Sequence, residues 1–268
     1  MIDLSLIIIT FNSKQLLVPC IESVRHSVRN ISLEIIVVEN GSQDGSAEWL
    51  QAQAGIKTIL NRQNRGVAPA RNQGLVESQG RYLMIMDVDT RVEPGALDIL
   101  VQCMDANPAV GLGAPKLVDG TGNLQYTCRY YPTVLTKLYR RLPSDYFKAK
   151  LREEIFDDWA HDTERDVDYV IGASQIFRRA AYEKVGPLDE SIFYGPEDID
   201  YCLRMWGAGW KVRYFPQAVI RHLERRITTK LFSAMTFKHA WGLLHFFWKH
   251  KYISNTGKLP GCRNFESK

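Results

Sequence analysis

Long hydrophobic runs and paired cysteines are both missing from this sequence. No apolar run approaches the roughly 20 residues that a membrane-spanning helix needs. The start of the chain has no basic stretch and no small-residue cleavage site, so we expect no signal peptide. The five cysteines are scattered without a Cys-x-x-Cys pair, which is typical of reduced core residues in a cytoplasmic protein. We therefore expect a soluble or peripheral protein.

A strong charge bias is missing too. The chain has 34 Lys and Arg against 30 Asp and Glu, a net charge of +4 over 268 residues, and the charges are mostly interspersed. This balance gives no reason to expect binding to nucleic acid, although weak basicity would suit an anionic substrate or a membrane surface. The length is sufficient for one large domain with a helical appendage.

Glycine is missing from a position at which many nucleotide-binding proteins hold phosphate. The segment Thr10-Phe11-Asn12-Ser13 follows the first apolar run and contains none. A nicotinamide-dependent oxidoreductase would have Gly-x-Gly-x-x-Gly there, and a sugar-phosphate nucleotidyltransferase would have a glycine-rich, basic loop. The sequence therefore disfavours both classes.

Four short apolar runs, rich in β-branched residues, alternate with segments of helical character in the first half of the chain. Strands are expected at 4–9, 34–38, 56–60 and 82–86. Helices are expected between them, at 14–28, 46–53 and 67–78. The runs are apolar on consecutive residues, which is typical of strands that helices cover on both faces. Right-handed βαβ connections then predict an α/β fold with an open, doubly wound, mostly parallel sheet.

The pattern becomes less regular after the fourth run. A helix opened by Pro94 is expected at 94–106, and further strands, with a turn at 119–122, are expected at 110–116, 124–129, 167–171, 174–177, 212–214 and 218–220. The stretch 131–165 has no clear period, so we expect a loop or helical insert that shapes a second substrate site. A helix is expected at 228–251.

Polar loops follow each of the four apolar runs. They are Thr10-Phe11-Asn12, Glu39-Asn40-Gly41-Ser42, residues 61–66, and Asp87-Val88-Asp89. In an open α/β sheet, ligands bind outside the carboxyl ends of the strands. Turn chemistry alone would explain the Asn, Gly and Ser residues, but it explains the acidic residues less well.

Asp87 and Asp89 lie two positions apart, so in extended backbone both side chains leave the same face. Two carboxylates on one side can share Mg²⁺ or Mn²⁺ and thereby hold a diphosphate. The alternative is a solvated strand end that caps the next helix. The position at the end of an apolar strand favours the metal, because two unpaired buried carboxylates would be costly.

Glu197, Asp198 and Asp200 form a second acidic cluster at the start of an expected helix. Acidic residues in a first helical turn stabilise the helix dipole, and a carboxylate at the rim of a cleft can also serve as a general base. Spacing alone does not separate these two interpretations. His222 follows the last apolar runs and is either structural or part of a metal or phosphate site.

Taken together, these segments resemble the family-two inverting glycosyltransferases of GT-A fold, particularly the bacterial rhamnosyltransferase-like branch that builds surface polysaccharides. The likeness extends from Leu4 to about Tyr252. It rests on seven segments in the order of the family: residues 9–12, 38–46, 61–66, 70–74, 87–89, 172–174 and 197–204.

The resemblance implies a metal-dependent, inverting transfer of sugar from a UDP- or dTDP-sugar to a hydroxyl of a glycan or polyprenyl-linked glycan. Residues 1–227 would form the catalytic domain, with a nucleotide-sugar half at 1–115 and an acceptor half at 116–227, and residues 228–268 would form a helical extension. The enzyme would be cytoplasmic or peripheral at the inner face of the cytoplasmic membrane. A non-catalytic carbohydrate-binding or scaffold protein of the same fold is the alternative.

The resemblance also assigns roles to residues. The donor would contact Thr10, Phe11, Asn12, Glu39, Asn64, Gly66, Arg71, Asp87 and Val88. Within this set, Glu39 would accept hydrogen bonds from the base, and it stands where the family more often has aspartate. Arg71 would reach the base or a phosphate, and Asp87 would contact ribose or metal-bound water.

The metal and the acceptor have their own implied residues. Asp89 would be the direct metal ligand, with His222 near the metal or diphosphate. Asp198 would be the catalytic base, and Glu197 would orient the acceptor hydroxyl. The acceptor site would include Gly172 and Ala173. The pair Gly195-Pro196 replaces aromatic residues that the family often has before the acidic cluster.

The expected C-terminal helix is amphipathic. An apolar stripe of Phe237, Trp241, Leu244 and Trp248 recurs at helical spacing, and Lys238, His245 and Lys249 lie on the other side. We expect this stripe to pack against the catalytic domain. The alternative is an interfacial helix that holds the enzyme near a lipid-linked acceptor.

Overall fold

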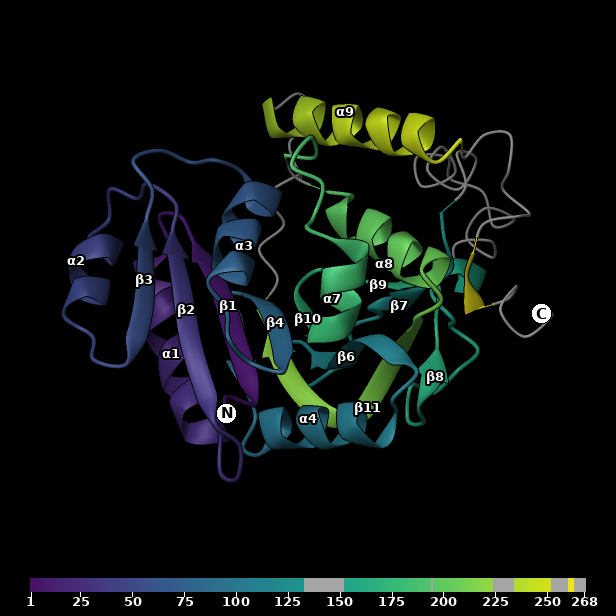
Figure 1. Cartoon of the computed structure of the whole chain (residues 1–268), viewed down its shortest axis with the longest axis horizontal. Coiled ribbons are helices and arrows are strands. Elements are labelled where there is room, and N and C mark those ends of the chain that lie inside the picture. Colours follow the sequence, from purple (N-terminus) through teal and green to yellow (C-terminus); the bar gives the residue numbers. More distant parts are fainter. Residues whose placement is uncertain (133–151, 194, 224–233, 252–259, 263–268) are drawn as a thin grey trace.

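The computed structural model of the chain describes residues 1–132, 152–193, 195–223, 234–251 and 260–262, and for residues 234–238 it describes the backbone alone. A nine-stranded sheet with the order β3-β2-β1-β4-β10-β6-β11-β5 runs through the molecule, and β8 pairs with β11. Helices lie on both faces of this sheet (Figure 1). The expected α/β class with a doubly wound sheet is therefore confirmed.

The first four strands are parallel, as predicted. They are β1 (Leu4–Thr10), β2 (Leu33–Glu39), β3 (Ile56–Leu60) and β4 (Tyr82–Asp87). The helices that connect them are α1 (Lys14–Ser27), α2 (Ser46–Gln51) and α3 (Val67–Val76). Each helix begins at the predicted residue and ends one or two residues before the predicted end.

Consecutive side chains of β1 enter two different cores. Leu6 and Ile8 belong to a buried cluster with residues of α1 and α4 (Ala96–Ala106). Ile7 belongs to the cluster on the opposite face, with residues of α3, α7 (Arg179–Val185) and α8 (Glu197–Gly207). Because neighbouring side chains of a strand point to opposite faces, a strand covered on both faces is apolar at every position.

The sheet continues with strands that are not all parallel. They are β5 (Thr90–Val92), β6 (Val110–Val118), β8 (Arg165–Asp166), β10 (Ser174–Arg178) and β11 (Lys211–His222). β10 runs antiparallel to both β4 and β6, whereas β6 and β11 are parallel. A separate antiparallel pair consists of β7 (Cys128–Arg129) and β9 (Tyr169–Val170). The second part of the fold is therefore mixed rather than purely parallel.

Several predicted boundaries in the second half were wrong. α4 begins at Ala96 and not at Pro94, because Gly95 adopts a left-handed conformation (φ 78°) before the first turn. The strands expected at 124–129 and 167–171 are each reduced to two residues, β7 and β9. The runs 212–214 and 218–220 belong to one strand, β11, with an irregularity between Phe215 and Val219. Most of the insert expected at 131–165 lies outside the described residues.

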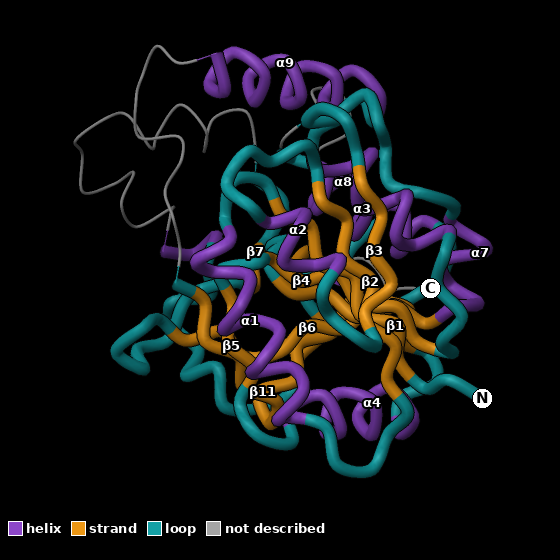
Figure 2. The backbone as a smooth tube through the Cα atoms, turned by 90° about the vertical axis from the view of Figure 1, so that its left-hand side faces the viewer, coloured by secondary structure: helices purple, strands orange, loops and turns teal. Residues whose placement is uncertain are grey.

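The C-terminal helix α9 (Ala234–Lys249) lies across one end of the molecule, beside α8 and above α3 (Figures 1 and 2). It packs through the buried Phe246 and through Gly242, whereas Trp241, Leu244 and Trp248 are exposed. The prediction that the apolar stripe packs against the domain was therefore wrong for these three residues. The side chain of Phe237 lies outside the described part. No described helix is both long and apolar enough to cross a bilayer.

Candidate active site

The carboxyl ends of β1, β2 and β4 meet at one edge of the sheet. Thr10 at the end of β1 is the register partner of Glu39 at the end of β2, and Ile9 is the partner of Asp87 at the end of β4. Ligands bind at this edge in open α/β sheets. The polar loops selected from the sequence are therefore neighbours in space.

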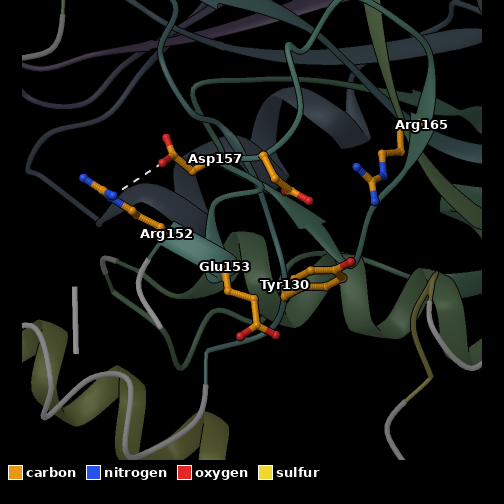
Figure 3. Close-up of a pocket in the computed structure, with 6 residues that line it drawn as sticks. Tyr130, Arg152, Glu153, Asp157 and Arg165 are labelled. Carbon is orange, nitrogen blue, oxygen red and sulfur yellow. Dashed lines mark ion pairs between the residues drawn. The ribbon is translucent and has the colours of Figure 1, made fainter. Parts of the chain in front are cut away.

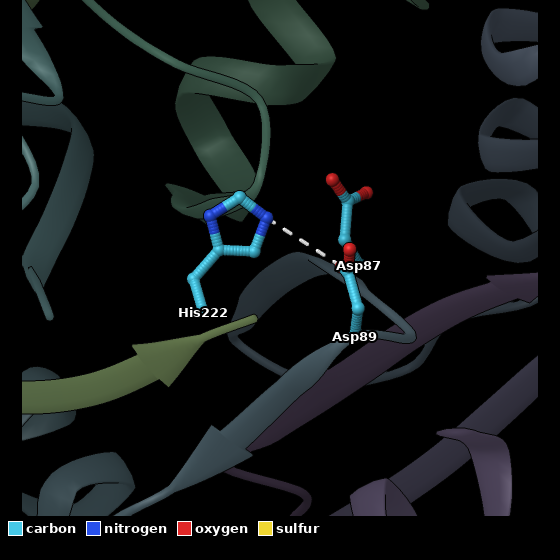
Figure 4. A group of neighbouring side chains, drawn as sticks. All are labelled: Asp87, Asp89 and His222. Atoms are coloured by element: carbon cyan, nitrogen blue, oxygen red, sulfur yellow. Dashed lines mark ion pairs between the residues drawn. The ribbon is translucent and has the colours of Figure 1, made fainter. Parts of the chain in front are cut away.

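Asp87, Asp89 and His222 each offer a ligand atom, and these atoms all lie within 4.8 Å of one another (Figure 4). The aspartates come from the end of β4 and the turn after it, and His222 ends β11, where it pairs with Thr90 of β5. Its Nε2 lies 3.5 Å from Oδ1 of Asp89. Carboxylate oxygens suit hard divalent cations, and imidazole is a common metal ligand. The group can therefore hold a divalent cation.

Gln125 fixes the orientation of the His222 ring. Its Nε2 donates a hydrogen bond to the carbonyl of His222 (2.9 Å), and its Oε1 lies 2.9 Å from Nδ1 of the ring. Because Oε1 can only accept, Nδ1 carries a proton, and in the neutral ring the lone pair is on Nε2, which faces Asp89. A neutral ring in this orientation would offer Nε2 to a cation beside Asp89, whereas a protonated ring would pair with Asp89 directly.

Arg71 of α3 joins the metal group to the second acidic cluster. Its Nη2 donates to Oδ1 of Asp87 (2.7 Å) and to the carbonyl of Gly172 (2.8 Å), and its Nη1 donates to Oε1 of Glu197 (3.2 Å). The guanidinium side chain is only 4% exposed. Arg71 thus bridges the buried Glu197 and the partly exposed Asp87, and its expected contact with the base or a phosphate of the donor stays a prediction.

Asp198 is held by the backbone N–H of the same glycine, whose carbonyl binds Arg71. The backbone N–H of Gly172 donates to Oδ2 of Asp198 (3.0 Å), and the N–H of Ile199 donates to Oδ1 (2.8 Å). A Cβ atom at position 172 would come within 2.9 Å of Nη1 of Arg71, so a side chain here would displace the guanidinium. One glycine residue thus contacts Arg71 through its carbonyl and the partly exposed carboxylate of Asp198 through its N–H.

The two neighbouring acidic residues of α8 differ in environment. Glu197 is buried, and its Oε2 has no partner among the described residues. Burial and the nearby Asp198 raise the pKa of Glu197 to about 7, although Arg71 opposes the shift. Burial also raises the pKa of Asp87, against the effect of Arg71 and with that of Asp89. An additional cation near these carboxylates would be stabilising.

Two residues expected around the nucleoside, Glu39 and Asn64, form hydrogen bonds within and between the loops that follow β2 and β3. Glu39 is buried, and its two carboxylate oxygens accept hydrogen bonds from the backbone N–H groups of Gly41 (3.2 Å) and Ser42 (2.7 Å). Asn64 Oδ1 accepts from the N–H of Gly66 (2.9 Å) and from Asn40 Nδ2 (3.1 Å). These contacts give the loops after β2 and β3 a defined shape.

The remaining predicted residues lie around this edge in different environments. Thr10 is buried, and its Oγ1 has no hydrogen-bond partner in the described structure. Phe11 is exposed, and Asn12 adopts a left-handed conformation (φ 48°). Val88 packs against the core beside α1 and α4. The carbonyl of Ala173 accepts a hydrogen bond from the N–H of Asp87 (2.9 Å), so it supports the metal group directly.

A cavity of about 480 Å³ lies among residues 130–165 (Figure 3). It is lined by Tyr130, Arg152, Glu153, Asp157, Asp158 and Arg165. Arg152 pairs with Asp157 (3.6 Å), and the guanidinium of Arg165 lies over the ring of Phe156 (4.6 Å). No predicted site residue lines this cavity.

The fold matches those of known sugar-transferring enzymes. The structure of GalNAc-T7 with UDP, GalNAc and Mn²⁺ aligns with a TM-score of 0.69 and 16% identity, over 96% of this chain and 50% of that one. The mannosyltransferase from Pyrobaculum calidifontis in complex with GDP-Man and Mn²⁺ aligns with a TM-score of 0.61 and 19% identity, over 96% and 65% of the two chains. The fold is the GT-A fold of glycosyltransferases.

The sequence comparisons give the family. The family model described as glycosyl transferase family 2 matches residues 5–186. The chain belongs to this family and is a glycosyltransferase. It is 24% identical to the N-acetylglucosaminyl-diphospho-decaprenol L-rhamnosyltransferase of Mycobacterium tuberculosis, over 73% of this chain and 68% of that protein. It is 30% identical to the pre-mycofactocin glycosyltransferase of the same organism, over 72% of this chain but only 38% of that protein.

Two residues of the site were not singled out from the sequence. Asn40 is a hub of the second loop, since its Oδ1 accepts hydrogen bonds from Asn61 Nδ2 and from the N–H of Arg65, both at 3.1 Å. Its position directly after β2 could have predicted this role, because ligand-binding loops follow the carboxyl ends of parallel strands. Gln125 gave no such signal, because its contact with His222 spans 97 positions of the chain.

Proposed function

We propose that the chain catalyses metal-dependent, inverting transfer of a sugar from a nucleotide-sugar to an acceptor hydroxyl. The observation that carries this proposal is the continuous set of contacts from Asp87 through Arg71 and Gly172 to Asp198. It links a group able to hold a cation with a carboxylate able to take a proton. A non-catalytic protein of this fold would have no need for both groups in one connected arrangement.

Asp89 and His222 are the proposed ligands of Mg²⁺ or Mn²⁺, and Asp87 would contact ribose or metal-bound water. A bound divalent cation would stabilise the negative charge that develops on the leaving diphosphate. Thr10, Phe11, Asn12, Glu39, Asn64, Gly66 and Val88 are the proposed donor-binding residues. Within this set, the loop contacts of Glu39 leave each carboxylate oxygen able to accept a further hydrogen bond.

Asp198 is the proposed base. Gly172 N–H and Ile199 N–H fix its carboxylate, and its partial exposure gives an acceptor access. The acceptor hydroxyl would lose its proton to Asp198 while attacking the anomeric carbon from the face opposite the leaving group, so the configuration inverts. Buried Glu197 would act on the acceptor only through its neighbours, while Gly172 and Ala173 would form the floor of the acceptor site.

The proposed acceptor is a glycan or polyprenyl-linked glycan of surface polysaccharide biosynthesis. It is supported by the rhamnosyltransferase relative, whose name specifies N-acetylglucosaminyl-diphospho-decaprenol. The proposed location of the enzyme is the cytoplasm, where it would meet a lipid-linked acceptor as a peripheral protein at the inner face of the cytoplasmic membrane. Residues 1–115 would then bind the donor and residues 116–227 the acceptor.

The proposal is tested with UDP- and dTDP-sugars, Mn²⁺ or Mg²⁺, and a synthetic polyprenyl-diphosphate-linked N-acetylglucosamine. We expect Asp198→Asn to lower transfer by about 10²- to 10⁴-fold, because a positioned base contributes that much. Its thermal stabilisation by donor and metal should match the parent. Asp89→Ala should instead lose the metal-dependent stabilisation. Transfer by Asp198→Asn at the parent rate would show that another group is the base.

A further inference from the structure

The helix α9 presents an unusually apolar surface to solvent. Trp241, Leu244 and Trp248 are 70%, 62% and 80% exposed. Spacings of three and four residues put them on one side of the helix, and we call these three residues the docking face. Scattered exposed apolar residues are normal in proteins, but two tryptophans and a leucine on one stripe indicate a binding surface.

The opposite side of α9 holds the helix in one orientation. Phe246 is fully buried there. Lys249 pairs with Asp189 (2.6 Å) and Asp200 (2.8 Å), and His250 Nε2 lies 2.7 Å from Asp200. Rotating the helix to bury the tryptophans would break these ion pairs and expose Phe246. The docking face is therefore directed away from the catalytic domain.

The C-terminal residues of the chain are much more basic than the rest, and this difference in charge indicates an anionic binding partner. Residues 223–268 contain nine Lys and Arg against two Asp and Glu, whereas residues 1–222 contain 25 against 28. A tail with net charge +7 on a body with net charge −3 is attracted to an anionic surface. Tryptophan is the side chain that prefers the boundary between lipid headgroups and acyl chains.

We propose that the docking face of α9 inserts into the headgroup region of an anionic phospholipid bilayer. The helix would lie in the plane of the membrane, with Trp241, Leu244 and Trp248 toward the acyl chains and with Phe246 toward the protein. A second copy of the chain is the other possible occupant of an apolar face. The basic charge of the tail argues against it, because two such tails would repel each other.

The position of α9 connects this surface to the candidate base. A Cβ atom at Gly242 would come within 2.6 Å of the carbonyl oxygen of Gly195, and one at Gly195 within 2.9 Å of His239 Nδ1. The helix thus packs on the segment that leads directly into α8, where Asp198 is the second residue. Docking would hold the acceptor site at the height of the headgroups, a consequence that rests on the proposed function.

Vesicle flotation with the full chain tests the surface itself. We compare phosphatidylcholine vesicles with and without phosphatidylglycerol, using the parent and the double variant Trp241→Ser/Trp248→Ser. The parent should float with the anionic vesicles, and the variant should bind them at least about tenfold more weakly, since burying each indole contributes more than that factor. The matched control is Val76→Ser, because Val76 is 73% exposed on α3 and lies outside the docking face.

Three results would overturn the proposal: no flotation of the parent, equal flotation of parent and double variant, or a parent dimer in solution that the double variant loses. Thermal unfolding of the variants at the parent temperature excludes misfolding as the cause of weaker binding. Flotation requires no donor, acceptor or turnover, so its failure is distinguishable from failure of the proposed reaction. If both hold, the double variant should lose transfer to vesicle-bound acceptor but keep transfer to a short, water-soluble acceptor.

Discussion

Residues 1–115 and residues 116–222 position their site residues in different ways. In the first region, parallel strands are joined by short helices, and site residues bond to their own loops, as Glu39 does to Ser42 three positions on. Residues of the second region depend on distant contacts, which span 97 positions from Gln125 to His222 and 126 positions from Glu197 back to Arg71 of the first region. The loops of the nucleotide-sugar half are therefore fixed mainly by contacts close in sequence, whereas the candidate base Asp198 and the ring of His222 depend on contacts that form only in the assembled fold.

Arg71→Met gives the largest expected effect on this long-range arrangement. It leaves Asp87 and Glu197 in the protein without their cation, which should lower the free energy of unfolding by about 3 kcal/mol or more. Arg81→Met is the matched control, because Arg81 pairs with Asp3 and Asp105 at the start of β4 but is 36% exposed. Its cost should stay below about 2 kcal/mol for the two pairs.

Chemical denaturation of both variants measures the difference. Equal destabilisation of the two variants would contradict the dependence of the site on the long-range Arg71 contacts, since these contacts would then contribute no more than a surface ion-pair cluster. Arg71→Lys should fall between the parent and Arg71→Met, because lysine keeps the charge but cannot form the planar fork to two carboxylates.

Gln125→Leu tests whether the distant contact with His222 supports metal binding. Loss of its hydrogen bonds frees the His222 ring, and we expect Mn²⁺ affinity to fall by about 10- to 100-fold, which is usual for such supporting residues. Titration of Mn²⁺ by calorimetry is the measurement. The control is Gln217→Leu, because Gln217 lies on β11 as His222 does but bonds to Glu164 away from the site. Unchanged affinity in Gln125→Leu would mean that His222 is not a ligand or needs no orientation.

Glu197→Gln should change how the stability of the protein depends on pH. The pKa of Glu197 is raised from 4.5 to about 7, so the folded state binds this proton more tightly than the unfolded state does. The contribution to stability is therefore complete below about pH 4.5 and is lost as the pH rises through 7. Thermal unfolding of the variant should lack this loss, which amounts to at most about 1.4 kcal/mol per pH unit.

Glu77→Gln is the control for the pH experiment, because the Glu77 side chain is 49% exposed at the end of α3. It should show the parent's dependence on pH. A Glu197→Gln variant with that same dependence would mean that Glu197 titrates as an ordinary surface carboxyl, and its burial would then have no electrostatic consequence.

The strands of the first region were predictable because they are buried on both faces. Ile7 and Ile8 enter different cores, so every position must be apolar, and the run is visible in the sequence. The strands β7 and β9 have only two residues each and no periodic pattern, so neither their length nor their pairing was predictable. Local pattern is informative only where an element is long enough to repeat.

The C-terminal helix shows the same limit. Its amphipathic spacing was visible, but the side that faces the protein was predicted wrongly for Trp241, Leu244 and Trp248. The deciding contacts are those of Lys249 and His250 with Asp189 and Asp200, which lie about 50 to 60 positions away. Helical periodicity defines two faces but does not state which one has a partner.

The sequence by itself determined the alternating strands and helices, the polar loops at their carboxyl ends, and the carboxylates available for a cation and a proton. These follow from burial and backbone geometry within a few residues. Only the tertiary structure decided that Arg71 bridges Asp87 and Glu197, that Gln125 orients His222, and that two tryptophans of α9 face outward. Such contacts join segments far apart in the chain, and no local pattern encodes them, because they form only after the separate elements have packed.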